Sequence, residues 1–153
     1  MPGPTNLFAL EPVLLQALRE VLPAGVRVGS GANLVGRTSL AGLCPAVLVT
    51  PMESAVSDGD DDPAPGEAVT TEDETWTVTA LVAFTRDADG LTSNFQQAGE
   101  LLGRAYDALH GLGVPGYRTL VYTGRQQPMP TVDGVCECSI DFNVIRAFAP
   151  AEP

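Results

Sequence analysis

The sequence predicts an α+β domain, an α/β sandwich in which a largely antiparallel sheet of about four to five strands carries two helices packed on one face. Three observations lead to this prediction. Two segments repeat apolar residues at helical spacing, several others alternate apolar and polar residues, and their order is helix, strands, loop, strand, helix, two strands. The 153 residues, 44% of them hydrophobic and 18% charged, match one globular domain. We therefore expect residues 1–153 to form a single domain.

Helical spacing is clear in two segments. The first is EPVLLQALREVLP at residues 11–23, where leucines and valines recur three and four positions apart. The second is TSNFQQAGELLGRAYDALHG at residues 92–111, in which Ser93 and Gln96 have the spacing of a capping box and Gly111 stands at a C-cap position. Its apolar stripe is expected to comprise Phe95, Ala98, Leu102, Ala105 and Leu109.

Strand patterns account for most of the remaining apolar residues. Short strands are expected at VRV (26–28), CPAVLV (44–49) and YRTLVYTG (117–124), and QQPMPTVDG reads as a Pro-rich turn. Long alternating strands are expected at TWTVTALVAFT (75–85) and VCECSIDFNVIRAF (135–148). Their buried faces would carry Trp76, Val78, Ala80, Val82 and Phe84 in one strand and Cys136, Cys138, Ile140, Phe142 and Val144 in the other.

Most of the acid lies in residues 51–74, PMESAVSDGDDDPAPGEAVTTEDE, between two predicted strands. We expect an acidic, solvated loop insertion at about 53–74. Its carboxylates Asp58, Asp60, Asp61 and Asp62 resemble the start of a calcium loop, but Val69 stands where the closing Glu is required. Weak ion binding and partner docking remain alternatives to a plain charge run.

The charge balance argues against several classes of protein. Nineteen acidic residues stand against eight basic ones, all Arg and all scattered singly, so the net charge of -11 does not suit a nucleic-acid groove. No apolar run approaches the roughly 20 residues of a membrane span, and the start of the chain lacks the features of a signal peptide. With three cysteines, an odd number, we expect a cytosolic protein with reduced thiols.

The motif most suggestive of chemistry is GANLVGRT at residues 31–38, which is close to the phosphate-binding pattern GxxxxGK[ST]. Arg37 replaces the required Lys, and Pro45 arrives before a helix could follow. We therefore expect a flexible Gly-rich loop.

Cys44, Cys136, Cys138 and His110 could in principle form a zinc site. The face that carries the CxC pair continues with apolar residues, however, so both thiols are expected in the core. His110, at a helix end, is expected to interact with the helix C-terminus, and Trp76 is expected in the core. No active site, metal or cofactor is expected.

The arrangement as a whole resembles the tail terminator proteins of long-tailed phages, in particular the small version of Mu-like contractile tails. The resemblance rests on EPVLLQALREVLP, CPAVLVT, the acidic insertion, ETWTVTALVAF, AGELLGRAYDAL and GVCECSIDFNVIRAF, in that order. The strongly acidic insertion and the absence of lysine depart from it. It implies a non-enzymatic virion protein that forms a six-membered ring on the head-proximal end of the tail tube, stops tube polymerisation and joins the tail to the head.

The same resemblance implies the partners. They are other copies of the chain, the tail tube protein, a neck or head-completion protein and, in a contractile tail, the sheath protein, whereas DNA would pass through the ring unbound and no membrane is involved. The virion is the final location, and assembly takes place in the host cytoplasm. An acidic lumen would repel the DNA phosphates, so we expect the loop from Glu53 to Glu74 on the ring surface or lumen, becoming ordered on assembly.

Cross-subunit partners for these carboxylates are expected among the arginines in or beside loops: Arg37, Arg86, Arg118 and Arg125. Two alternatives remain. One is another neck or tail component, and the other is a cytosolic enzyme or ligand-binding module that uses the loop at 29–38 or the cysteines.

Overall fold

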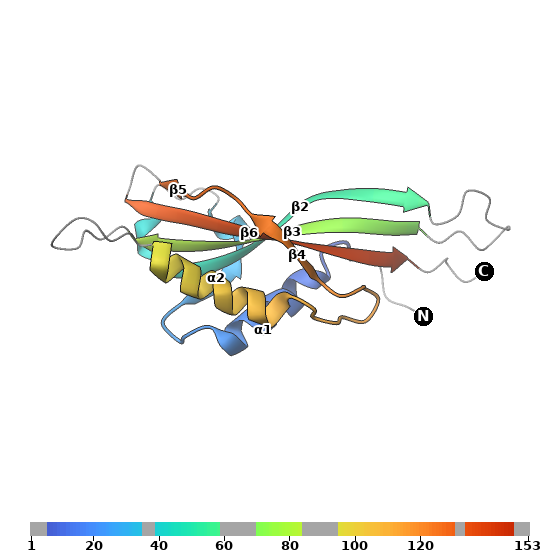
Figure 1. The fold of residues 1–153 in the computed structure, drawn as a ribbon, viewed down its shortest axis with the longest axis horizontal. Helices are drawn as coiled ribbons and strands as arrows, with labels where there is room; N and C mark the ends of the chain where they lie inside the picture. Colours follow the sequence, from blue (N-terminus) through green and yellow to red (C-terminus); the bar gives the residue numbers. More distant parts are fainter. Residues whose placement is uncertain (1–5, 35–38, 59–69, 84–94, 131–133, 149–153) are drawn as a thin grey trace.

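The computed structural model describes residues 6–34, 39–58, 70–83, 95–130 and 134–148. Two helices lie against one side of a sheet (Figure 1). In chain order the elements are α1 (Leu10–Val21), β1 (Arg27–Ser30), the 3-10 turns η1 (Gly31–Leu34) and η2 (Ala41–Leu43), β2 (Ala46–Asp58), β3 (Thr70–Ala83), α2 (Phe95–Leu109), β4 (Val121–Arg125), β5 (Met129–Pro130) and β6 (Val135–Phe148).

The sheet has the strand order β1-β2-β3-β6-β4, and the two-residue β5 pairs with β6 beside this path. Only the β1–β2 pair is parallel, while the β2–β3, β3–β6, β4–β6 and β5–β6 pairs are antiparallel. The predicted class, a largely antiparallel sheet with two helices on one face, is confirmed. The predicted Pro-rich turn contains β5, which adds a short strand that the sequence analysis does not include.

The main core lies between the helices and the central strands. Alternation along β3 and β6 places every second side chain on this face, as the sequence predicts. The buried side chains are Leu10, Leu14, Leu18 and Leu22 near α1, Ala98, Leu101, Ala105 and Leu109 on α2, and Val47, Val49, Trp76, Val78, Ala80, Val82, Leu120, Cys136, Cys138, Ile140, Phe142 and Val144 around the sheet. On α2 the predicted Phe95 is 44% exposed, and Leu101 is buried instead.

The opposite face of the sheet is apolar only in part. A small cluster of Leu43, Ala46, Leu48, Leu81 and Val135 lies beneath the η2 turn. Further along β3 and β6 this face is polar. Pairs of side chains bond across the strands there: Thr79 with Ser139, and Asn143 with Asp73. Cross-strand pairs of this kind stabilise a sheet that has water on one side.

The acidic segment is where the structure differs most from the prediction. Residues 51–58 belong to β2 and residues 70–74 to β3, so the predicted loop at about 53–74 is wrong at both ends, whereas residues 59–69 lie outside the described part. The two strands pair from Ser54–Glu74 to Asp58–Thr70 after a register shift between Pro51 and Ser54. Among the side chains described in these two segments only Glu74 is buried, so the other charged and threonine side chains keep contact with water.

These residues build an extension of the sheet, here called the arm. It consists of residues 51–58 of β2, 70–74 of β3 and 144–148 of β6. In Figure 1 the arm projects beyond the ends of both helices. β1 pairs only with residues 46–49 of β2, so within the described residues no strand covers the outer edge of the arm.

The described ranges also end near several predicted features. Phe84, Thr85 and the predicted capping residue Ser93 lie outside them. At the other end of α2, Gly111 has a φ of 79°, which confirms the predicted glycine C-cap because side chains disfavour this left-handed conformation.

Candidate functional site

A partly apolar pocket of about 210 Å³ lies at the base of the arm. One side is formed by Leu7 and Phe8, which precede α1 and are 54% and 58% exposed. The rest is formed by two neighbouring strands, with Pro51, Met52 and Ser54 from β2 and Glu72, Glu74, Thr75 and Trp76 from β3. The β2 residues bracket the register shift, so the pocket adjoins the uncovered edge of the sheet.

Glu74 is the chemically unusual group in this pocket. It is only 5% exposed, because it lies on the same face of β3 as Trp76. Oε1 accepts a hydrogen bond from the Trp76 indole Nε1–H at 3.4 Å, whereas Oε2 is buried and has no hydrogen-bond partner among the described residues. A buried carboxylate with an unsatisfied oxygen is costly, so this arrangement calls for an explanation.

The surroundings raise the pKa of Glu74 above its ordinary value of 4.5. Desolvation by burial is the largest cause, and the charge of Glu72 adds to it. The hydrogen bond from Trp76 and the charge of Arg146 act in the opposite direction but do not compensate. The nearby positive charge therefore stabilises the ionised form of Glu74 too little to offset the cost of its burial.

A second orphaned group lies close by on the β6 side. Tyr117 has a buried hydroxyl without a hydrogen-bond partner in the described structure, and burial followed by the charge of Glu74 raises its pKa. Arg146 lies over the rings of Tyr117 and Phe148, at 5.3 and 4.7 Å from the ring centroids. Its Nη1 donates to the Asn6 carbonyl at 2.8 Å, which fixes this cation beside the N-terminal segment.

Asp141, on the polar face of the sheet, differs from Glu74 in that both of its carboxylate oxygens have hydrogen-bond partners. Asp141 accepts a bond from Thr77 Oγ1 at 2.5 Å, and the Gln126 side-chain amide lies 3.2 and 3.3 Å from its two oxygens. Because both oxygens have partners, this carboxylate shows no unmet demand for a ligand.

The cysteine pair lies in the core, as predicted. Cys136 is fully buried and Cys138 is 7% exposed, with their sulfur atoms 3.5 Å apart. Burial, together with the neighbouring Cys136, raises the pKa of the Cys138 thiol to about 12. A thiol of this kind stays protonated at neutral pH and is a poor nucleophile or metal ligand.

For His110 the predicted interaction with the helix C-terminus stays a prediction, and the structure adds two further contacts. It follows the last residue of α2, and its Nδ1 accepts a hydrogen bond from the Tyr122 backbone N–H at 3.1 Å. Its ring stacks on Tyr106 with the centroids 5.0 Å apart. Through this hydrogen bond the histidine links the end of α2 to β4.

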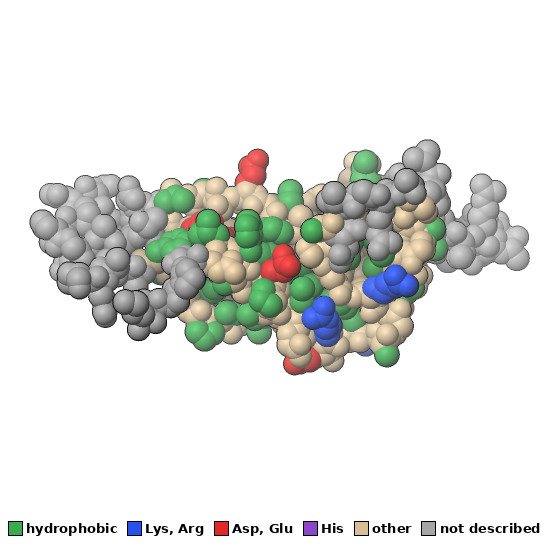
Figure 2. All heavy atoms as spheres, turned by 180° about the vertical axis from the view of Figure 1, so that it is seen from behind, with side chains coloured by type: hydrophobic (Ala, Val, Ile, Leu, Met, Phe, Trp, Pro, Cys, Tyr) green, Lys and Arg blue, Asp and Glu red, His purple; other side chains and the backbone are tan. Residues whose placement is uncertain are grey.

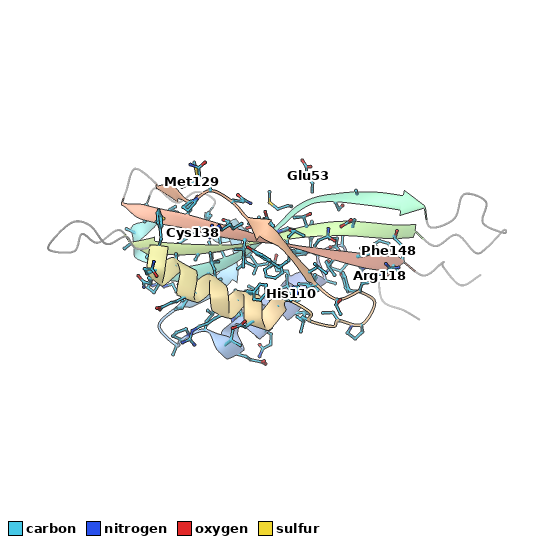
Figure 3. All side chains as sticks on the ribbon, in the orientation of Figure 1. Glu53, His110, Arg118, Met129, Cys138 and Phe148 are labelled. Atoms are coloured by element: carbon cyan, nitrogen blue, oxygen red, sulfur yellow. The ribbon has the colours of Figure 1, made fainter. Side chains whose placement is uncertain are left out.

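Two of the predicted interface residues, Arg118 and Arg125, are described and exposed. Arg125 belongs to β4, and the Arg118 backbone N–H donates to the Ile145 carbonyl of β6 at 2.8 Å. Figure 3 shows Arg118 towards the arm end of the sheet, and Glu53 on the opposite side of the sheet from His110. Asp58 is the last residue of β2, and Arg37, Asp60, Asp61, Asp62 and Arg86 lie outside the described residues.

Glu74 and Tyr117 are not among the site residues predicted from the sequence. For Glu74 a signal was present: it stands two residues before Trp76, so the alternation that buries Trp76 places this acid on the same face. Tyr117 offers no comparable signal, because its burial depends on the residues that pair with the edge of β6.

Exposed hydrophobic side chains are prominent on this molecule. Viewed from behind, green side chains gather over the middle of the surface, and blue ones form separate spots (Figure 2). The large exposed ones include Leu7, Phe8, Met52 and Val56 around the arm, and Phe95, Tyr106, Val121 and Met129 near α2, β4 and β5. Apolar surface of this extent commonly marks contact with other proteins.

No helix in the described ranges is long and apolar enough to cross a membrane. No protein-family model and no curated protein matches the chain. Among solved structures, the chain is similar to one in "Virion of native gene transfer agent (GTA) particle", with a TM-score of 0.46 and 16% sequence identity over 93% of this chain and 89% of that one.

Proposed function

We propose that the protein is a structural component of a phage-like virion and, within it, the tail terminator. Six copies would form a ring on the head-proximal end of the tail tube, stop polymerisation of the tube protein and provide the joint to the head and neck. The protein would act through its surfaces, without catalysing a reaction and without a cofactor. The order and type of its elements support this proposal, because they match those of the family that the sequence resembles.

The arm is the observation that carries the proposal. Three strands continue beyond the helix layer, although this extension adds little to the core of the domain. Around it lie Leu7, Phe8, Met52 and Val56, each more than half exposed, and one open strand edge. Open edges and clustered apolar side chains favour association, which a monomeric domain would avoid.

A closed ring requires two different surfaces on each copy, one for each neighbour. The outer edge of β2 in the arm and the opposite edge, beside β6 and β4, are distinct in this way. The charge of -11 suits a ring through which DNA must slide without sticking. The proposed cross-subunit pairs join carboxylates of the acidic segment, which include Asp58, Asp60, Asp61 and Asp62, to arginines of a neighbour, with Arg37, Arg86, Arg118 and Arg125 as the candidates.

The tube protein, a neck or head-completion protein and, in a contractile tail, the sheath protein complete the proposed set of partners. The decisive experiment deletes the coding sequence from the particle-producing source and examines the products by negative-stain electron microscopy. Overlong tubes beside detached, filled heads are the expected result, and restoring the gene should restore normal tails. Tails of normal length joined to heads would contradict the terminator role and favour another neck or tail component.

A ligand-binding module makes a different prediction. Ligand at a hundredfold excess over its dissociation constant would stabilise such a module by about 2.7 kcal/mol. A thermal-shift screen with nucleotides and zinc separates the two classes. We expect no shift, since Cys136 and Cys138 are buried among core residues.

A further inference from the structure

The pocket at the base of the arm has the chemistry of a receptor for an arginine side chain. Its floor holds Glu74 Oε2, which lacks a partner in the described structure, and Glu72 adds a second negative charge. Its rim holds the exposed side chains of Leu7, Phe8 and Met52. An arginine combines an apolar stem with a cationic head that forms strong hydrogen bonds to carboxylates, so it complements both parts of the pocket.

The chain itself can supply this cation. Among the described arginines, three donate to backbone carbonyls of their own chain: Arg19 to Val28, Arg104 to Val21 and Arg146 to Asn6. Arg27, Arg118 and Arg125 are exposed and make no such side-chain bond within the described residues. Among the described arginines, these three are therefore the candidates for an intermolecular contact.

Position along the strands selects Arg118 from this set. Its backbone bonds to Ile145, while Glu74 pairs with Val144, so Arg118 and Glu74 lie at the same level of the sheet. They lie at opposite edges of the arm, because the pocket adjoins the open edge of β2 and Arg118 lies beyond β6. Arg27 pairs at the other end of β2, opposite Ala46, and Arg125 pairs with Ile140.

We propose that Arg118 of one copy inserts into the pocket of the neighbouring copy and pairs with its Glu74. This inference rests on the proposed ring and names the contact that would build it. In a ring whose axis runs along the strands, a side-by-side neighbour keeps its level, so residues at one level on opposite edges meet. The contact also accounts for the orphaned Oε2, which would gain its missing partner on assembly.

The first test is a double-mutant cycle in which sedimentation velocity and mass photometry measure self-association. Arg118→Ala and Glu74→Gln should each weaken association by about tenfold or more, since each leaves a buried charge or its partner unpaired. The double variant should be no weaker than the single variants, because the two changes remove one interaction. Arg27→Ala is the matched control: it removes the same charge elsewhere and should leave association unchanged.

The second test asks whether the two sites meet. One chain carries Thr119→Cys, next to Arg118 so that this arginine is kept, and another carries Ser54→Cys at the pocket wall. The mixture is treated with a bismaleimide whose spacer is about as long as an arginine side chain. The mixture should give much more cross-linked dimer than either chain alone. Each chain alone reports the background from Cys44, which is half-buried. Arg27→Cys mixed with Ser54→Cys should resemble this background.

Additive effects in the cycle, or an Arg118→Ala variant that associates like the wild type, would overturn the inference and leave the ring intact. A wild-type chain that stays monomeric at millimolar concentration would also overturn it, because the contact requires a second copy. Neither result decides the tail terminator role. That role fails only if deletion of the gene leaves normal tails joined to heads.

Discussion

Glu74 shows how one residue can connect stability to assembly. Its pKa is raised in the folded protein, chiefly by burial. Between the ordinary value of 4.5 and the raised value, the folded chain holds a proton that the unfolded chain has released. The free energy of unfolding must therefore fall as the pH rises through this window. At neutral pH the buried carboxylate of Glu74 therefore lowers the free energy of unfolding of the monomer, and a neighbouring copy could supply its missing partner.

A Glu74→Gln variant tests this account, because the amide keeps the shape of the side chain without its charge. We expect the free energy of unfolding of the variant to exceed that of the wild type by an amount that grows as the pH rises from about 4.5 towards 8, since the burial cost applies only to the ionised form. Urea denaturation across this pH range measures the difference.

The exposed Glu53, on the neighbouring strand, gives the matched control. Glu53→Gln should change the free energy of unfolding by no more than about 0.5 kcal/mol at any pH in the range. A difference between Glu74→Gln and the wild type that is flat in pH would show that burial does not perturb this carboxylate.

At the scale of elements, apolar periodicity predicts the helices and strands that pack one face in the core. α1, α2, β3 and β6 follow from their apolar spacing, because in each element one face packs in the core and the other lies towards water. The arm segments 51–58 and 70–74 and the strand β5 do not follow from it. These segments are held by backbone pairing with neighbouring strands, which leaves no apolar alternation to read. The pocket is missed for the same reason: it forms where the arm, the α1 entry segment and the register shift meet.

α1 provides a prediction at this scale, since it carries buried and exposed apolar residues side by side. Leu14 is fully buried, and Val13 is 37% exposed. Leu14→Ala should lower the free energy of unfolding by about 2–5 kcal/mol, because it leaves a cavity between α1 and the sheet. Val13→Ala should change it by no more than about 0.5 kcal/mol. Urea denaturation of both variants checks this, and equal losses would contradict the packing described for α1.

For the molecule as a whole, charge and surface act against each other. Every copy carries a formal charge of -11, so copies repel, while the exposed apolar side chains around the arm favour contact. The balance depends on ionic strength, because the Debye length falls from about 30 Å at 0.01 M salt to about 3 Å at 1 M. Repulsion between whole copies acts over long distances and is screened first, whereas a buried pair such as Arg118 with Glu74 is screened much less.

Self-association of the proposed ring should therefore strengthen as sodium chloride rises from about 0.01 M to about 1 M. Sedimentation velocity across this series measures the change. The variant Glu53→Gln with Glu100→Gln, which removes two exposed carboxylates outside the pocket, should show a smaller gain because less repulsion remains to be screened. Association that weakens with salt in both proteins would mean that exposed attractive charge pairs hold the copies together. In that case the apolar surfaces around the arm would contribute less to association than these charge pairs.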